Sequence, residues 1–261
     1  METPISFWQL INANHIEIPA IQRDYVQGYE SEKISLIRNR FLQALFDTIY
    51  TDNKTLELDF IYGYTIQDKE GANTFVPLDG QQRLTTLYLL HWFVAHKEDS
   101  AEIIVLNKFN YTTRHSSEMF CQKLITNKLV SFQHNIASTI RNQKWFFESW
   151  NNDPTINSML TTLNEIEEKY KPNSNTWQIL TSSENKIVFY SLPMEKFGLS
   201  DELYIKMNSR GKALTEFEYF KSVFPNMLST DFKDEFIKKI DGEWSDGFWN
   251  YFKNEIGRAH V

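Results

Sequence analysis

The chain has 261 residues, of which 41% are hydrophobic and 23% are charged, and its formal net charge is −7. This length and composition predict one large or two small folded domains with a substantial core. The acidic balance argues against general, charge-driven binding of nucleic acids, although a local basic groove remains compatible with it. Cys121 is the only cysteine, which excludes an internal disulfide and a cysteine-based zinc site.

The sequence contains no apolar stretch near the roughly 20 residues that a membrane-spanning helix needs. Its first residues also lack the basic region and the apolar region of an export signal. We therefore expect no membrane partner and a cytoplasmic location.

Hydrophobic periodicity predicts a first unit of mixed strands and helices over residues 1–97. The expected elements are, in chain order, a short helix over Ile5–Ile11, a strand over His15–Ile18, a helix over Ser31–Tyr50, a hairpin of two strands over Leu56–Ile66 and Thr74–Leu78, and a helix over Gln81–His96.

Residues 98–261 are predicted to be mainly helical, with Asp153 before Pro154 and the pair Thr215 and Glu218 as helix-start signals. The expected elements are helices over Ser117–Ile125 (opened by Ser116), Ile136–Trp150, Pro154–Tyr170, Asp201–Asn208, Glu216–Leu228 and Phe232–Ile240, and one buried strand over Lys186–Leu192. No linker separates the two parts, so we expect them to pack closely. The aromatic cluster that precedes Val261 suggests a piece of a longer protein.

The most informative segment lies between a predicted strand and a predicted helix. It reads Asp79-Gly80-Gln81-Gln82-Arg83 and is followed by Thr85 and Thr86. Backbone N–H groups at a helix start bind anions, an arginine can clamp a phosphate, and an aspartate can hold a metal ion or orient water. The alternative is an ordinary helix cap in a tight turn.

Three further polar clusters stand beside predicted elements. Gln22-Arg23-Asp24-Tyr25 follows a strand, and Asn208-Ser209-Arg210-Gly211 lies between two helices. A helix C-cap would explain Gly211, but it would not explain Arg210 or Lys221. The hydroxyl-rich segment over Tyr111–Ser117 precedes a helix, and capping by Ser116 would explain part of it.

Common catalytic signatures are absent from the sequence. There is no P-loop, no Gly-x-Gly-x-x-Gly, no His-Glu-x-x-His and no Gly-x-Ser-x-Gly. His91 and His96 are five residues apart on a predicted helix, so they point to different sides and do not favour a metal site.

Three motifs, taken in order, resemble the ParB-like domain at the N-terminus of GmrSD-type modification-dependent restriction enzymes. They are Ile18–Tyr25, Asp79–Thr86, and Met207–Thr215 with Lys221. That domain is similar to the wider ParB and sulfiredoxin superfamily, in which such a strand-turn-helix binds nucleotide phosphates. The resemblance implies an α+β fold, with a ParB/sulfiredoxin-like mixed-sheet unit over residues 1–97 followed by the mainly helical part over residues 98–261.

The resemblance also implies a binding site for a nucleoside triphosphate (GTP, ATP or CTP, without a preference) and Mg²⁺. Its catalytic residues would be Asp79, Gln81, Gln82 and Arg83, with Asp79 on the metal ion and an amide orienting the attacking water. The other nucleotide-binding residues would be Gly80, Thr85, Gln22, Arg23, Asn208, Arg210, Gly211 and Lys221. Near Gln27 the chain departs from the family pattern, which usually has a tryptophan there.

Such enzymes usually carry an HNH-type nuclease domain, and nothing in this sequence supplies its residues, so we expect no nuclease activity from this chain alone. The leading hypothesis is an NTP-binding and NTP-hydrolysing sensor domain of a DNA-restriction, anti-phage defence protein. Its nuclease domain would lie in the same longer chain or in a partner chain. The first alternative is a non-hydrolysing reader of modified DNA that uses Gln22, Arg23 and Tyr25. The second is a structural fragment with poorly assembled motifs.

Overall fold

The structure is a computed structural model, and it describes residues 3–19, 24–67, 69, 71–129, 135–172 and 174–193, with residues 232, 236, 239, 240 and 244. This part of the chain contains both helices and strands, and the stretch between β4 and β5 is helical. In order they are α1 (Phe7–Ala13), β1 (His15–Ile18), α2 (Glu32–Tyr50), β2 (Leu56–Gln67), β3 (Asn73–Pro77), α3 (Gln81–Lys97), the 3₁₀ helix η1 (Ala101–Lys108), β4 (Phe109–Tyr111), α4 (His115–Thr126), α5 (Ile136–Arg141), the 3₁₀ helix η2 (Glu148–Asn152), α6 (Pro154–Lys169), α7 (Thr176–Thr181) and β5 (Ile187–Pro193).

The strands form one five-stranded mixed sheet in the order β4-β1-β3-β2-β5. The predicted hairpin is confirmed, because β2 and β3 pair antiparallel with Tyr64 opposite Val76. Strand β1 runs parallel to both of its neighbours, β3 and β4, and β5 runs parallel to β2. The carboxyl ends of β3, β1 and β4 therefore lie at the same end of the sheet.

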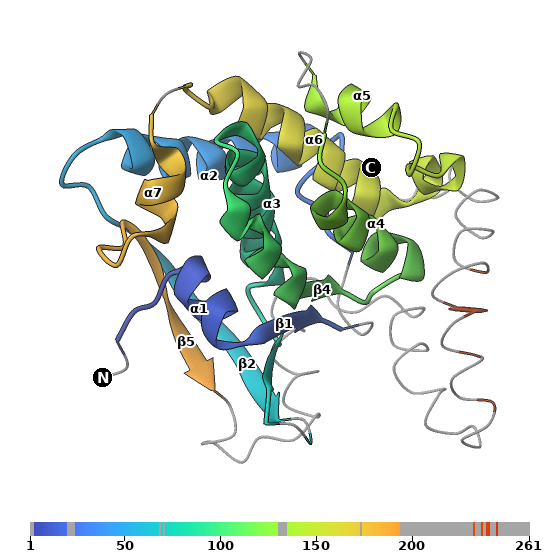
Figure 1. The fold of residues 1–261 in the computed structure, drawn as a ribbon, viewed down its shortest axis with the longest axis horizontal. Coiled ribbons are helices and arrows are strands. Elements are labelled where there is room, and N and C mark those ends of the chain that lie inside the picture. Colours follow the sequence, from blue (N-terminus) through green and yellow to red (C-terminus); the bar gives the residue numbers. More distant parts are fainter. Residues whose placement is uncertain are drawn as a thin grey trace.

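Helix α3 forms the centre of the core and runs between the sheet and the other helices (Figure 1). It is apolar on nearly all sides, which is typical of a helix that is buried all round. Its residues 84–95 are all buried, and it packs against α6, η1 and α7. The mixed α/β arrangement thus places the start of α3 at the carboxyl end of β3 and its remainder inside the protein.

The sheet takes strands from both predicted parts. Strands β4 and β5 come from residues 98–261, yet they pair with β1 and β2 from residues 1–97. This pairing agrees with the expectation that the two parts pack closely. The boundary between them at residue 97 stays a prediction. None of the helices in the described part of the chain is long and apolar enough to cross a membrane.

Two sequence-based expectations for the helical part are wrong. The single helix over 136–150 is interrupted, since α5 ends at Arg141 and η2 begins at Glu148. Instead of continuing the helix, Phe146 packs edge-on against Trp150, with ring centroids 5.4 Å apart. Ser116 does not cap α4, because the N-cap is Arg114.

Several short elements were not predicted: β4, η1 and α7. Strand β4 and helix α7, with three and six residues, are too short for periodicity to identify them, and η1 is a 3₁₀ helix, which lacks the 3.6-residue period. The helices expected over 201–208 and 216–228, and the capping pair at Thr215, lie outside the described residues.

Candidate functional site

Three polar segments meet at the carboxyl ends of β3, β1 and β4. The first holds Asp79 and Gly80, the second holds Asp24 and Tyr25, and the third begins at Thr112. The backbone N–H of Thr112 donates to the carbonyl of Ile18 at 2.9 Å, which continues the pairing of β4 with β1. Loops at the carboxyl ends of parallel strands are where α/β proteins commonly bind ligands.

The turn before α3 is tightly held. The backbone N–H groups of Leu78 and Asp79 both donate to the carbonyl of Tyr62, at 2.7 and 3.1 Å. Gly80 is the N-cap of α3 with φ 90°, a left-handed conformation that favours glycine. A Cβ atom there would also lie 2.9 Å from Cγ1 of Ile61. As a glycine it offers no side-chain cap, so the positive end of α3 opens beside Asp79, whose side chain is 60% exposed.

Gln82 joins this helix start to the segment that follows β1. Its Nε2 donates to the carbonyl of Asp24 at 3.0 Å, and its Oε1 accepts from the backbone N–H of Val26 at 3.0 Å. Both ends of the amide are thus used on one loop. The structure therefore brings two of the predicted motifs together, although the two residues of the first contact are 58 positions apart in the sequence.

Arg83 holds a different neighbour, the irregular start of β2. Its guanidinium donates to the carbonyl of Leu58 and, through Nη2 at 2.8 Å, to the carbonyl of Phe60. The register of β2 against β5 shifts between Glu57 and Phe60, in the same stretch as these two carbonyls. The same Nη2 lies 3.5 Å from Oδ2 of Asp79. Arg83 therefore holds the start of β2 and also lies next to the exposed carboxylate of Asp79.

Two other predicted site residues of α3 lie inside the protein. Thr85 is completely buried, and its hydroxyl donates to the carbonyl of Gln81 at 2.8 Å. Gln81 itself is only 6% exposed. In this structure Gly80 and Gln81 are buried, and Asp79, Gln82 and Arg83 form the accessible part of the segment.

Tyr25 is also completely buried. Its hydroxyl is hydrogen-bonded to Thr86 at 2.8 Å and donates to Thr162 at 3.1 Å, and burial raises its pKa to about 12. A side chain without exposed surface cannot contact DNA in this conformation, so the predicted DNA contact of Tyr25 is not supported. The other predicted residues, namely Gln22, Arg23, Asn208, Arg210, Gly211 and Lys221, lie outside the described residues.

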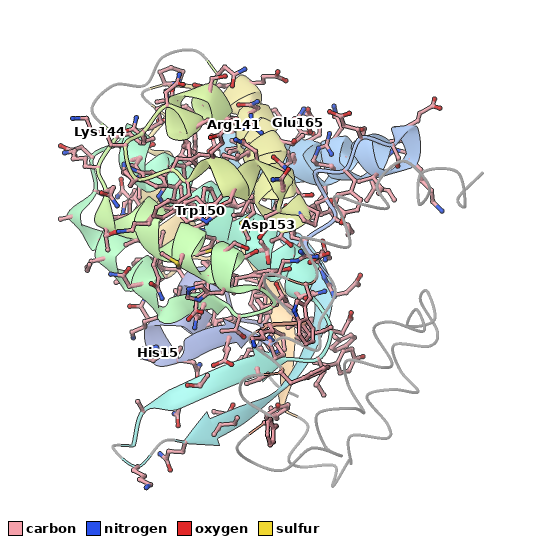
Figure 2. All side chains as sticks on the ribbon, turned by 90° about the vertical axis from the view of Figure 1, so that its right-hand side faces the viewer. His15, Arg141, Lys144, Trp150, Asp153 and Glu165 are labelled. Carbon is pink, nitrogen blue, oxygen red and sulfur yellow. The ribbon has the colours of Figure 1, made fainter. Side chains whose placement is uncertain are left out.

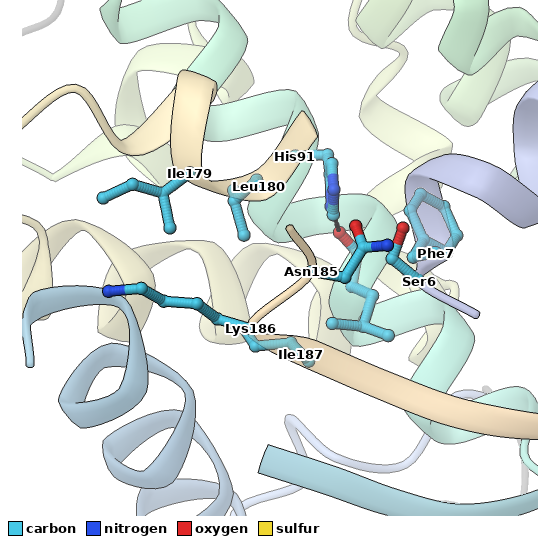
Figure 3. A pocket seen from close by; sticks show the side chains of 9 residues that line it. Ser6, Phe7, His91, Ile179, Leu180, Asn185, Lys186 and Ile187 are labelled. Carbon is cyan, nitrogen blue, oxygen red and sulfur yellow. Dashed lines mark hydrogen bonds between the residues drawn. The ribbon is translucent and has the colours of Figure 1, made fainter. Parts of the chain in front are cut away.

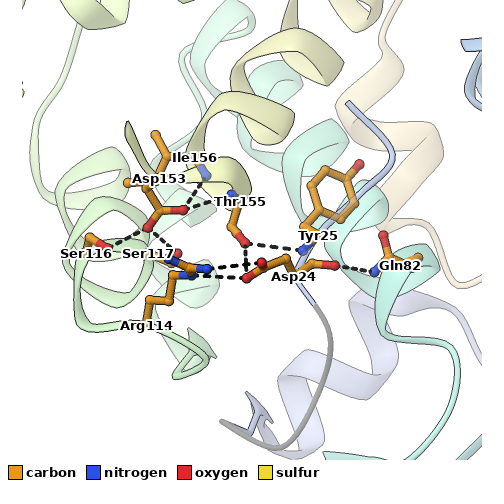
Figure 4. Close-up of polar contacts among 9 residues, drawn as sticks. All are labelled: Asp24, Tyr25, Gln82, Arg114, Ser116, Ser117, Asp153, Thr155 and Ile156. Carbon is orange, nitrogen blue, oxygen red and sulfur yellow. Dashed lines mark hydrogen bonds and ion pairs between the residues drawn. The ribbon is translucent and has the colours of Figure 1, made fainter. Parts of the chain in front are cut away.

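Sequence analysis missed Arg114, which pairs with Asp24 (Figure 4). Its Nε and Nη2 donate to the two carboxylate oxygens of Asp24, at 3.1 and 3.2 Å. The hydroxyl of Thr155 donates to the same carboxylate at 3.2 Å. The available signal was the polar segment Tyr111–Ser117. Its position at the sheet end was not predicted, because β4 has only three residues.

Asp153 directly precedes α6 (Figure 2) and joins it to α4 through a hydrogen bond from Ser117. It caps α6 as predicted, by accepting the backbone N–H groups of Thr155 and Ile156 at 2.8 and 3.1 Å. The hydroxyls of Ser116 and Ser117 donate to its other carboxylate oxygen. Burial raises the pKa of Asp153, and the nearby Arg114 guanidinium opposes that rise.

In the part of the chain that the structure describes, no group of three or more His, Cys, Asp or Glu residues is arranged to hold a metal ion. His91 instead lines a small internal cavity with Phe7, Leu180 and Asn185 (Figure 3). It is 2% exposed, and its Nδ1 is hydrogen-bonded to the carbonyl of Leu87 at 2.7 Å. His91 is therefore a core residue.

Fold and geometry together define an α/β protein with a candidate anion-binding site at the carboxyl ends of three parallel strands. Residues 7–225 match the family model described as GmrSD restriction endonuclease, N-terminal domain. This match covers most of the chain, and the chain belongs to that family. No curated protein matches the chain.

Proposed function

We propose that this N-terminal domain of a GmrSD-type restriction enzyme binds a nucleoside triphosphate at the Asp79–Arg83 segment and hydrolyses it to regulate restriction. The observation that carries the proposal is the start of α3. It opens at a glycine N-cap at the carboxyl end of a strand, beside an exposed carboxylate and an arginine. Backbone N–H groups and the helix dipole at such a place favour phosphate oxygens.

The exposed Asp79 fits the proposed Mg²⁺. Magnesium in nucleotide sites is usually held by one or two carboxylates together with phosphate oxygens, rather than by a cage of protein ligands. A single carboxylate at 60% exposure matches that pattern. The ion would neutralise phosphate charge. Arg83, next to Asp79, would add positive charge, and Arg23, Arg210 and Lys221 remain predicted contributors.

Gln82 takes a more specific role in this proposal. Because both ends of its amide hold the Asp24–Val26 backbone, it would have to leave these contacts to orient an attacking water. We assign to it the task of keeping the first motif against the second. The ParB/sulfiredoxin-like origin of the site and the nuclease partner domain belong to the same proposal.

The test compares two exposed aspartates at opposite ends of α3. Asp79→Asn should weaken Mg²⁺-dependent binding of ATP, GTP or CTP by about tenfold or more, because it removes a carboxylate at the phosphate site. Asp99→Asn is the matched control: Asp99 is 76% exposed at the far end of α3, and its φ of 52° suits asparagine.

Binding would be measured by titration calorimetry and hydrolysis by phosphate release, with melting temperatures to show that both variants fold. The proposal would be refuted if none of the three nucleotides bound the wild-type chain at millimolar concentration. Equal binding by wild type and Asp79→Asn would remove Asp79 from the site.

The alternative, a non-hydrolysing reader of modified DNA, has less support. Tyr25 is buried, and the chain carries a net charge of −7. Mobility shifts on modified and unmodified duplexes, with and without nucleotide, separate the two functions. Salt-dependent binding that ignores nucleotide would favour the reader.

A further inference from the structure

We infer that Arg114 is a positioning residue of the candidate site, acting through Asp24 on the segment Asp24–Val26 that lies against the start of α3. The expected effect on nucleotide binding rests on the proposed function. Whether Arg114 holds Asp24 in place can be tested separately. Asp24 begins the described segment after β1, and Gln82 at the start of α3 holds the backbone of that same segment at Asp24 and Val26.

Three elements anchor the segment that begins at Asp24. Helix α3 supplies Gln82, which binds the backbone on both sides of Tyr25. Helix α6 supplies Thr155, whose hydroxyl accepts from the backbone N–H of Tyr25 at 3.3 Å and donates to the Asp24 carboxylate. The start of α4 supplies Arg114. Of these anchors, Arg114 is the charged one.

The geometry of the Arg114 pair makes it a directional contact. Two parallel N–H···O bonds fix both the distance and the plane of the carboxylate, which a lysine cannot do. The side chains of Arg114 and Asp24 are only 12% and 27% exposed, whereas the surface pair Lys128 and Asp99 is 72% and 76% exposed. Shielding from water makes an ion pair stronger and less sensitive to salt.

Arg114 stands next to a buried hydrogen-bond network around Asp153. The hydroxyls of Ser116 and Ser117 bind Asp153, which caps α6, and Thr155 of that first turn returns to Asp24. Chain connectivity and hydrogen bonds thus close a ring from Asp24 through the start of α4 and the start of α6 back to Asp24 (Figure 4). A displacement at the start of either helix would be passed to Asp24, and from there to the loop.

The experiment compares Arg114→Gln and Asp24→Asn, alone and combined, with Lys97→Gln. Lys97 forms an ion pair of similar burial with Glu167, at 3.7 Å and with 24% and 12% exposure, near the end of α3. Each of the first two variants should raise KM for the nucleotide about tenfold or more, since a misplaced binding group is costly.

The double variant should be no worse than either single one, because both remove the same contact. Arg114→Lys should recover part of the loss, and Lys97→Gln should keep the wild-type KM. Hydrogen exchange at the backbone amides of Tyr25 and Val26 should become faster in Arg114→Gln and remain unchanged in Lys97→Gln.

The exchange measurement separates this inference from the proposed function. If the wild-type chain binds no nucleotide, the proposed function fails, and exchange at these two amides still decides whether Arg114 holds the loop. Wild-type exchange rates in Arg114→Gln overturn the inference. So does a double variant whose KM is the product of two independent losses.

Discussion

The two halves of helix α3 differ in how their polar side chains are used. In the amino-terminal half, Gln82 and Arg83 reach out of the helix and hold the backbone of two other segments, the loop after β1 and the start of β2. In the carboxyl-terminal half, Trp92 donates its ring N–H to the carbonyl of Leu124 at 2.8 Å, in the middle of apolar packing.

His91 illustrates the second half. Its ring packs against Phe7, with centroids 4.8 Å apart, and stacks parallel to Trp8 at 6.2 Å. Its Nδ1 is bonded to Leu87 within the same helix. Half-buried polar residues that bind the backbone of other motif segments therefore indicate the site, whereas a fully buried histidine packed against aromatic rings indicates a core residue. The following predictions test that difference.

The largest effect is expected at the helix start. Gly80→Ala combines a left-handed backbone with a Cβ that would lie 2.9 Å from Ile61, and it should lower the free energy of unfolding by about 2–4 kcal/mol. Gly71→Ala is the control, since Gly71 has φ 87° but no heavy atom within 4 Å of the added Cβ. It should lose about 1–2 kcal/mol, the cost of the backbone alone. Equal losses in urea unfolding would show that the close approach to Ile61 is unimportant.

The carboxyl-terminal half of α3 should make the stability of the fold depend on pH. Burial lowers the pKa of His91 to about 4, below its usual value of 6.5. The unfolded chain then binds a proton that the folded chain refuses, so stability is fully present above pH 6.5 and falls as the pH drops toward 4. The loss is at most about 3 kcal/mol.

His91→Leu should flatten this dependence, and His15→Gln, a change at an exposed histidine, should preserve it. Burial also lowers the pKa of His96, so a smaller slope should remain in the leucine variant. Denaturant unfolding between pH 4 and 7 provides the measurement. An unchanged slope in His91→Leu would contradict the packing role.

The smallest effect is expected at Tyr25, where the loop meets α3 and α6. Tyr25→Phe removes a hydroxyl that contacts both Thr86 and Thr162, and it should cost about 1 kcal/mol. Thr162→Val removes one of the same contacts and should cost a similar amount. If the two losses simply add in the double variant, the hydroxyls do not form one network.

The elements that the sequence predicted correctly are those whose signals lie in neighbouring residues. The hairpin of β2 and β3 and the helices α2, α3 and α6 were predicted from alternation, from 3.6-residue periodicity and, for α6, from its cap at Asp153. The stretch that includes Phe146 was wrongly predicted as helix. The sequence did not show that the helix is interrupted there and that Phe146 packs against Trp150. Strand β4 was missed because three residues carry no period.

The strand-turn-helix at Asp79–Arg83, with its glycine and its arginine, was determined by the sequence alone, since caps, turns and periodicity are properties of neighbouring residues. Only the tertiary structure decided what these side chains contact. In the folded chain Gln82 donates to the backbone carbonyl of Asp24, Tyr25 is buried, and Arg114 pairs with Asp24. The physical reason is the strand order β4-β1-β3, which brings the ends of three separate segments together at one end of the sheet.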